Sequence, residues 1–180
     1  MSLPQPILIF FGGQSAEHEV SIITGIQVVE NVDRNLFEPH VIYVRKDGVM
    51  DYKPHIRKRN DFSPEMDTEV QLGKDAKGGY VRIPGMLREQ RVYPKAAYLA
   101  FHGGTGEGGV YQGLLESLGI PYSSPSYESS AVALNKLLTK AVFEKQGIPC
   151  LAGTGVMRQE FLAAPEQSTQ ELVSTHSLPV

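Results

Sequence analysis

Two glycine-rich loops carry the side chains of this chain that are best suited to chemistry. The first loop, residues 12–17 (GGQSAE), follows the apolar run 7–11, and the second, residues 102–109 (HGGTGEGG), follows the apolar run 96–101. Glycines allow the backbone to approach a ligand closely, and the amides at the start of a following helix attract an anion. Glu17 adds a carboxylate that would hold a cation such as an ammonium group. The first loop therefore suits a zwitterion such as an amino acid.

His102 is the candidate that the second loop offers. It directly follows an apolar strand-like segment, so its imidazole should project into the crevice at the carboxyl end of the sheet and donate to a carboxylate or phosphate. Lys136 lies on a later expected helix, from which it could reach a nucleotide phosphate. Each candidate also has a purely structural interpretation. Glu17 and Glu19 can complement the helix dipole. His102 can cap local backbone, and Lys136 can be a solvated surface lysine.

The second loop also contains a literal G-x-G-x-x-G at Gly104, Gly106 and Gly109, with the acidic Glu128 about 20 residues further on. This pattern keeps a second function open, a non-catalytic Rossmann-like module that binds a nucleotide or amino acid and regulates a partner. A dinucleotide fingerprint normally belongs to the first strand-to-helix turn, with its acid at the end of the second strand. Glu128 instead falls at an expected helix start. The chain has no P-loop, no G-x-S-x-G elbow and no H-E-x-x-H.

The elements that must position the first loop form a strand–helix–strand unit. Residues 7–11 (ILIFF) predict a strand buried on both faces of a parallel sheet. Apolar residues at helical spacing predict an amphipathic helix over 18–32. Residues 38–44 (EPHVIYV) predict a second strand, which leads into a hairpin turn at 46–48. Two parallel strands joined by a helix indicate an α/β fold with a right-handed crossover.

The remaining chain is expected to contain a charged insertion and then a series of short elements. Residues 53–95 form the insertion, with one two-stranded excursion made of TEVQL and GYVRI. After it the sequence predicts a buried strand at 96–101, a helix over 110–118 and an edge strand at 119–122. Two further helices are expected, one from an N-cap at Ser126 to Leu134 and one over 136–146 that Gly147 ends. The last expected elements are a strand at 154–158 (TGVMR), a polar helical stretch to about Thr175 and a strand-like start at 178–180.

The composition excludes several classes of function. The 180 residues hold 17 Lys and Arg against 20 Asp and Glu, so a net charge of -3 leaves no global basic field for nucleic acid or an anionic membrane. The longest apolar run is six residues, whereas roughly 20 are needed to span a bilayer. Cys150 is the only cysteine and no Cys/His cluster has zinc spacing, which indicates a reducing compartment such as the cytoplasm. A small polar ligand is the expected partner.

Three segments, taken in order, resemble the N-terminal portion of D-alanine–D-alanine ligases. They are FFGGQSAEHEVS, HGGTGEGGVYQGLLESLGIPYSSPS and ALNKLLTKAVFEKQGIP. The family shows a GGxSxEHEVS loop after its first strand, an HGxxGEDGxxQGxLExxGIPYxG segment, and a helix of the form DKxxxK before GIPxP. The resemblance covers most of residues 7–150 apart from the insertion. It implies a Rossmann-like pre-ATP-grasp domain with a parallel sheet over 1–124, including an insertion at 53–95. Linker helices and the incomplete beginning of an ATP-grasp α+β domain would follow over 125–180.

The resemblance also implies a reaction and a set of residue roles. ATP and Mg²⁺ would serve to phosphorylate the carboxylate of one D-alanine, and the amine of a second D-alanine would then attack, giving a dipeptide for peptidoglycan. Glu17 would contact the ammonium of the first D-alanine and orient it, and Val20 would line that subsite. His102 would bind the carboxylate or acylphosphate, and Lys136 would touch an ATP phosphate. The metal ligands and most ATP contacts are expected beyond Val180, and the family implies a homodimer.

Two positions depart from the family's pattern. Gly108 stands where GEDG has its Asp, and Asn135 stands where DK has its Asp. Both changes remove a carboxylate near a candidate site residue, so they leave open a divergent paralogue with altered substrate or weakened activity. The chain is expected to be the N-terminal part of a longer ligase and to be inactive at this length.

Overall fold

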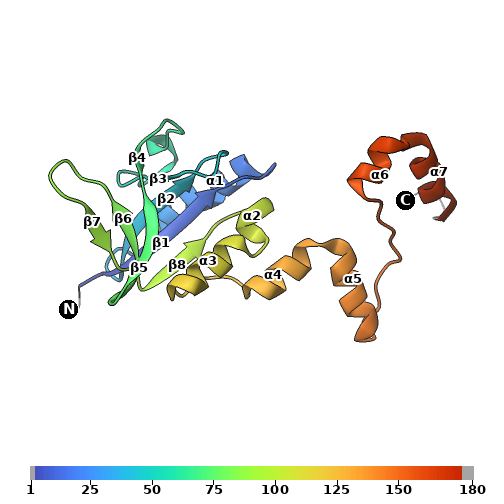
Figure 1. The fold of residues 1–180 in the computed structure, drawn as a ribbon. Coiled ribbons are helices and arrows are strands. Elements are labelled where there is room, and N and C mark those ends of the chain that lie inside the picture. Colours follow the sequence, from blue (N-terminus) through green and yellow to red (C-terminus); the bar gives the residue numbers. More distant parts are fainter. Residues whose placement is uncertain (1–2, 176–180) are drawn as a thin grey trace. The chain divides into compact units, whose positions relative to one another are not determined.

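The computed structural model describes residues 3–175, and the larger of its two sheets has five strands in the order β4-β3-β2-β1-β8 (Figure 1). The three strands β1 (Gln5–Gly12), β2 (Phe37–Val44) and β8 (Ala96–Leu99) run parallel. Two shorter strands, β3 (Met50–Tyr52) and β4 (Thr68–Glu69), extend one edge through antiparallel pairing, with β3 opposite in direction to β2 and β4 opposite to β3. The predicted α/β fold with a parallel sheet is confirmed, with an antiparallel edge added after the hairpin turn.

β1 is buried on both of its faces, as its continuous apolar run predicts. The side chains of Leu8, Ile9, Phe10 and Phe11 have no exposed surface. Successive side chains of a strand point to opposite faces. Leu8 and Phe10 belong to one core cluster, and Ile9 and Phe11 belong to another.

One helix covers the second of these clusters. Helix α1 (His18–Asn31) packs on it, contributing Val29, and its backbone comes so close to the sheet that a methyl group at Gly25 would overlap the ring of Phe11. Figure 1 shows α1 on one side of the sheet. The register of β1 and β2 runs without a break from Gln5 opposite Phe37 to Gly12 opposite Val44, so both strands end at the same edge.

The charged insertion is part of the core rather than an appendage. Its expected two-stranded excursion is present in part: GYVRI lies in β6 (Gly78–Ile83), which pairs with β5 (Gln71–Asp75), but TEVQL is divided between β4 and β5. The strand β7 (Gln90–Val92) adds a third antiparallel strand that the sequence did not predict. Alternate residues of β6 are buried, among them Val81 and Ile83, in the same cluster as Leu8 and Phe10. The segment also contains a 3₁₀ turn, η1 (Arg59–Asp61).

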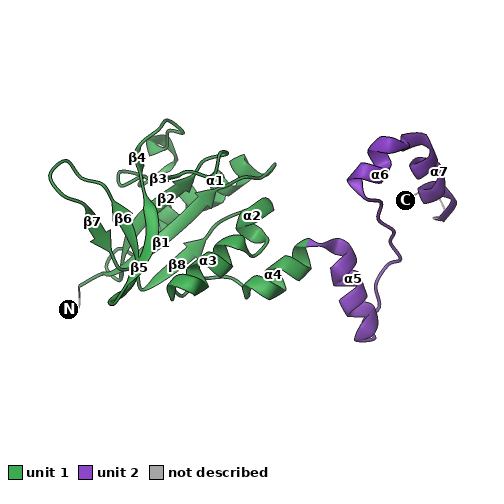
Figure 2. Ribbon diagram, viewed as in Figure 1, with its two compact units in different colours: residues 1–134 green, residues 135–180 purple. Residues whose placement is uncertain are grey.

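Three helices complete the first compact unit, which spans residues 1–134 (Figure 2). They are α2 (Gly104–Glu107), α3 (Val110–Leu118) and α4 (Tyr127–Leu134). The predicted N-cap is confirmed, because the Ser126 hydroxyl accepts from the Ser129 amide at 3.3 Å. The expected edge strand is reduced to a single parallel bridge between Ala97 and Tyr122. Because α4 packs on α2 and α3, this compact unit extends ten residues beyond residue 124, where the first domain was expected to end. The domain boundary at 124 stays a prediction.

The second unit, residues 135–180, contains α5 (Lys136–Lys145), α6 (Arg158–Ala163) and α7 (Pro165–Thr175). Gly147 follows α5 with φ +69°, as expected of a glycine that ends a helix. The predicted strand at 154–158 is wrong. Residues 151–157 form no regular element, and the described part of this unit offers no strand with which their backbone could pair. The expected strand start at 178–180 lies outside the described residues.

Over residues 3–175, none of the helices combines the length and the apolar character that a bilayer crossing requires.

Candidate active site at the carboxyl edge of the sheet

The two glycine-rich loops meet at the carboxyl edge of the parallel strands. Gly103 lies beneath the first loop, because a methyl group there would overlap the Glu17 carboxylate and come within 2.7 Å of the Ser15 hydroxyl. Gly104 lies against the carbonyl oxygen of Gln14 in the same way. The structure therefore brings Glu17 together with the His102–Gly103 dipeptide, although 85 residues separate them in the sequence. A small zwitterion needs groups of both kinds, and here a carboxylate lies against the residue that follows a histidine.

His102 and Gly103 are held from two sides. The Nε2 atom of His102 lies 2.8 Å from the Thr24 hydroxyl oxygen on α1. The Gly103 amide donates to the Glu107 carboxylate at 2.8 Å. Because Glu107 occupies that amide, it is not free to bind an anion. His102 is half-buried.

The other predicted site residues lie in two different places. Val20 is about half exposed on α1, three residues after Glu17 and four before Thr24, so the three share one face of the helix. Lys136 is the exposed first residue of α5 and belongs to the second unit. Its position relative to Glu17 and His102 stays a prediction.

Ser21 is a supporting residue that the sequence analysis missed. Its buried hydroxyl accepts from the Gly12 amide at 2.8 Å and donates to the Ala100 carbonyl at 2.9 Å. It thereby links the ends of β1 and β8, from which the two loops start. The sequence does contain a signal for this role: a serine lies on the apolar side of the expected helix, four residues from both Glu17 and Gly25.

Replacing Ser21 by Ala is expected to lower the free energy of unfolding by about 2–4 kcal/mol, because a buried amide and a buried carbonyl both lose their partner. Equilibrium urea unfolding measures this change. Ser117→Ala removes an exposed hydroxyl whose one partner among residues 3–175 is the Leu114 carbonyl; it serves as the control and should cost less than about 0.5 kcal/mol. Equal small effects at Ser21 and Ser117 would contradict the bridging role.

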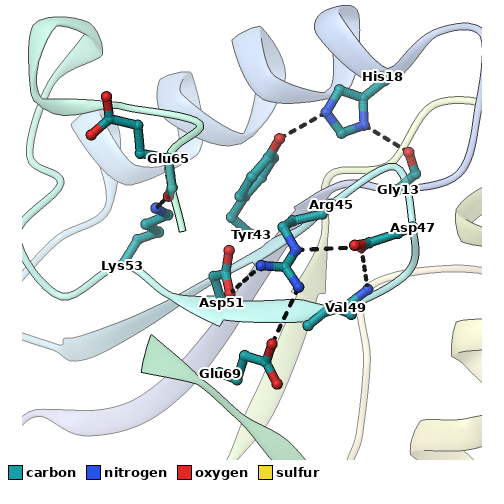
Figure 3. A network of polar contacts seen from close by, with 10 residues as sticks. All are labelled: Gly13, His18, Tyr43, Arg45, Asp47, Val49, Asp51, Lys53, Glu65 and Glu69. Carbon is teal, nitrogen blue, oxygen red and sulfur yellow. Dashed lines mark hydrogen bonds and ion pairs between the residues drawn. The ribbon is translucent and has the colours of Figure 1, made fainter. Parts of the chain in front are cut away.

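A second support lies under the first loop (Figure 3). The buried His18 ring bonds through Nδ1 to the Gly13 carbonyl at 2.7 Å and through Nε2 to the Tyr43 hydroxyl at 3.0 Å. A carbonyl can only accept, so Nδ1 carries the proton and the Tyr43 hydroxyl can donate to Nε2. Burial, followed by the nearby Asp51 carboxylate, raises the pKa of Tyr43, which keeps that hydroxyl protonated. His18 therefore fixes the loop backbone and not the ligand.

An ion-pair network continues from this support along β2 and β3 (Figure 3). The Arg45 guanidinium lies 3.3 Å from Asp47, 3.3 Å from Glu69 and 3.6 Å from Asp51. The Asp51 side chain has no exposed surface, and neither of its oxygens has a hydrogen-bond partner. Burial is the largest influence and raises the pKa of Asp51, while Arg45 and then Lys53 oppose the rise.

The raised pKa of Asp51 predicts a pH dependence of stability. Between the ordinary Asp pKa of about 3.9 and the raised value, the folded state holds more protons than the unfolded chain, so this carboxyl lowers the free energy of unfolding as the pH rises. Asp51→Asn removes this contribution, so its stability should increase more steeply with pH in that window than that of the parent protein. Urea unfolding at a series of pH values measures the slope.

Asp47→Asn is the matched control with the opposite sign. The Val49 amide, which donates to this carboxylate at 3.0 Å, and then Arg45 lower the pKa of Asp47, so its contribution is present above the ordinary pKa and is lost as the pH falls through the lowered value. Its replacement should flatten the acid side of the same curve. Parallel changes in both variants would contradict the assignment.

Magnesium finds no ligand set in the described part of the chain, since residues 3–175 contain no group of three or more His, Cys, Asp or Glu side chains that could hold a metal ion. The described residues therefore do not form a metal centre by themselves.

Comparison with known proteins decides the family. Residues 6–125, two thirds of the chain, match the family model of the D-Ala D-Ala ligase N-terminus. The chain belongs to the D-alanine–D-alanine ligase family. The predicted resemblance is thereby confirmed.

Solved structures of ligases agree with the family. The D-alanine–D-alanine ligase from Coxiella burnetii is 26% identical, with a TM-score of 0.79 over 97% of this chain and 49% of that one. The D-Ala:D-Ser ligase VanG from Enterococcus faecalis shares the fold, with 24% identity and a TM-score of 0.71 over 94% of this chain and 50% of its own. The ligase from Helicobacter pylori shares it at 22% identity and a TM-score of 0.72, over 90% and 49%. The chain thus spans about half the length of these ligases.

Both departures from the family's pattern have a local structural account. A Cβ atom at Gly108 would lie 2.6 Å from Cδ2 of Leu134, so a larger residue there would require the Leu134 side chain to move. Asn135 remains a helix N-cap, because its Oδ1 accepts from the amides of Leu137 and Leu138 at 3.1 and 3.2 Å, as an aspartate oxygen would.

Proposed function

We propose that this chain is the D-alanine-binding N-terminal part of an ATP-dependent D-alanine–D-alanine ligase that serves peptidoglycan synthesis. The observation that carries the proposal is the placement of the Glu17 carboxylate against Gly103, the residue that follows His102, at the edge where the two loops meet. In an amino acid the ammonium and carboxylate are separated by a single carbon atom. A carboxylate and an imidazole on neighbouring backbone segments can hold both groups at once.

The proposed roles follow from the charges of these side chains. Glu17 binds and orients the ammonium of the first D-alanine, and His102 donates to its carboxylate and then to the acylphosphate. Val20, exposed on the same helix face as Glu17, lines the subsite with an apolar surface. Lys136 contacts a phosphate of ATP. In the overall reaction the D-alanine carboxylate takes the terminal phosphoryl group of ATP, ADP leaves, and the amine of a second D-alanine displaces phosphate to form the dipeptide.

The proposal includes the setting of the full-length enzyme. It uses ATP with Mg²⁺, whose ligands are supplied outside the described residues, and it works in the cytoplasm as a homodimer. The 180-residue chain by itself is expected not to turn over, because the ligases it matches are about twice as long.

The test is ADP release by the full-length protein with D-alanine as the sole amino acid, with L-alanine as the control and with D-serine and D-lactate as alternative second substrates. D-alanine-dependent turnover supports the proposal. Absence of turnover with every D-amino and D-hydroxy acid would overturn it.

The regulatory module suggested by the G-x-G-x-x-G gains no support from the loop geometry. The Gly103 amide is occupied by Glu107, residues Gly104–Glu107 form the helix α2, and Glu128 lies on α4 instead of at a strand end. Titration of the protein with NAD separates the two functions. The regulatory module would be favoured if NMR signals of residues 104–109 shift on addition of NAD while signals near Glu17 do not change on addition of D-alanine.

A further inference from the structure

Thr24 contacts His102 of the proposed D-alanine site, although it belongs to neither glycine-rich loop. It lies on α1, one helical turn after Val20 and two after Glu17, on the face directed at the end of β8. Its hydroxyl oxygen is 2.8 Å from Nε2 of His102, across a separation of 78 residues. Among residues 3–175 this imidazole is the hydroxyl's hydrogen-bond partner, and Thr24 is likewise the partner of the imidazole.

This contact determines which ring nitrogen can serve a ligand. A neutral imidazole carries one N–H and one lone pair, and the bond made by one nitrogen sets the state of the other. The Thr24 hydroxyl can donate to Nε2 or accept from it; an anion bound at Nδ1 needs a proton there, so in the neutral ring that binds an anion the hydroxyl is the donor to Nε2. Nδ1 has no partner in the described residues, so its N–H is free to donate to an anion. If the ring becomes charged, the hydroxyl can rotate and accept from Nε2, and Nδ1 is still a donor.

The backbone on the far side of the ring is fixed as well. Gly103, directly after His102, is tied to Glu107 at 2.8 Å and has φ 64° and ψ -177°. The ring is therefore held at Nε2 by α1 while the chain beyond it is held by α2. With both ends fixed, loss of the Thr24 hydroxyl frees the rotation and the tautomer of the imidazole, but not the loop.

We propose that Thr24 is a positioning residue for His102: its hydroxyl holds Nε2 so that Nδ1 presents an N–H to the carboxylate, and later the acylphosphate, of the first D-alanine. This inference rests on the proposed function, because it gives a role to a residue behind the same site. No covalent step involves Thr24. Its contribution is to hold the ring in one orientation and one tautomer before the substrate binds, so that binding does not have to order the ring.

Kinetics of the full-length protein test the inference with two variants. Thr24→Val keeps the shape of the side chain and removes the hydroxyl, and it is expected to raise the KM for D-alanine by roughly 10-fold while the KM for ATP changes by less than about twofold. Thr24→Ser restores the hydroxyl and should return both values to within about twofold of the parent. Thr68→Val, the same chemical change on β4, is the matched control and should alter neither KM.

A spectroscopic measurement gives an answer that a merely structural role would not produce. In the full-length protein labelled with [¹⁵N]histidine and saturated with D-alanine, the Nδ1 signal of His102 should be that of a protonated nitrogen. In Thr24→Val it should move toward the average of the two tautomers. A His102 ring that carries its proton on Nε2 in the parent protein, or a Thr24→Ser variant as impaired as Thr24→Val, would overturn the inference.

Failure of this inference can be told apart from failure of the proposed function. If His102→Ala strongly impairs the use of D-alanine while Thr24→Val leaves it unchanged, the function stands and the role of Thr24 is refuted. If the parent protein turns over no D-alanine at all, the function itself is refuted, and the inference with it.

Discussion

Glu17→Gln in the full-length protein is expected to lower kcat/KM for D-alanine by roughly 100-fold, with less than about a twofold change in the KM for ATP. Glutamine has the same shape but no charge, so the substrate ammonium loses its counter-ion while the fold is preserved. Glu17 is exposed and lies over Gly103, so the substitution disturbs no buried packing. Steady-state kinetics with each substrate varied in turn measures the effect. His102→Ala is expected to act in the same direction.

Glu19→Gln is the matched control, because it separates substrate binding from a general effect on the helix. Both glutamates lie at the start of α1, where either could complement the helix dipole, but Glu19 instead pairs with Lys46 at 2.6 Å. Its replacement should leave kcat/KM for D-alanine within about twofold. Similar losses in both variants, or equal losses for D-alanine and ATP, would show that Glu17 is structural.

Gly103→Ala is expected to reduce kcat/KM for D-alanine by at least roughly 100-fold and to lower the free energy of unfolding by about 1–3 kcal/mol. With φ 64° and ψ -177°, the residue occupies a backbone region that is essentially restricted to glycine. In addition, the new methyl group would overlap the Glu17 carboxylate. The substitution should therefore displace the two site residues from one another. Kinetics and urea unfolding of the same preparation measure both effects.

Gly78→Ala controls for backbone strain alone. Gly78 has φ +126°, but a methyl group there would meet no atom within 4 Å, and the residue lies in the β5–β6 hairpin. This variant should lose stability and keep its kcat/KM for D-alanine. Full activity in Gly103→Ala would mean that the contact between Gly103 and Glu17 has no part in the site.

The sequence predicted the elements whose signals are local. Residues 7–11 lie in β1, which is buried on both faces, and the helical spacing over 18–32 correctly predicted α1. Ser126 caps the start of α4 and Gly147 follows the end of α5, as expected. Such patterns are readable because periodicity and capping depend on residues within a turn or two of one another. The site candidates were also visible, because glycines followed by Glu or His after an apolar strand have a chemical meaning of their own.

Elements whose stability depends on distant partners were missed or misjudged. β7 was not predicted, and β4, which lies inside the expected strand TEVQL, pairs with β3 and not with GYVRI. Both strands are too short to be stable alone and depend on the edges that β6 and β3 offer them. TGVMR has the composition of a strand but no described neighbour to pair with, and it remains irregular. In both cases the backbone hydrogen bonds, and not the side-chain pattern, decide the outcome.

The sequence alone thus determined the family, the α/β order of the first unit and the identity of Glu17 and His102 as candidates. The tertiary structure decided how the site is held together. Ser21 reaches Ala100 across 79 residues and Thr24 reaches His102 across 78, and it is folding that lays Gly103 under Glu17. A serine or threonine in a helix looks the same in sequence whether its hydroxyl contacts water or the ring of a distant histidine. Only the packing of α1 against the ends of β1 and β8 distinguishes the two, because a hydrogen bond requires a partner within about 3 Å.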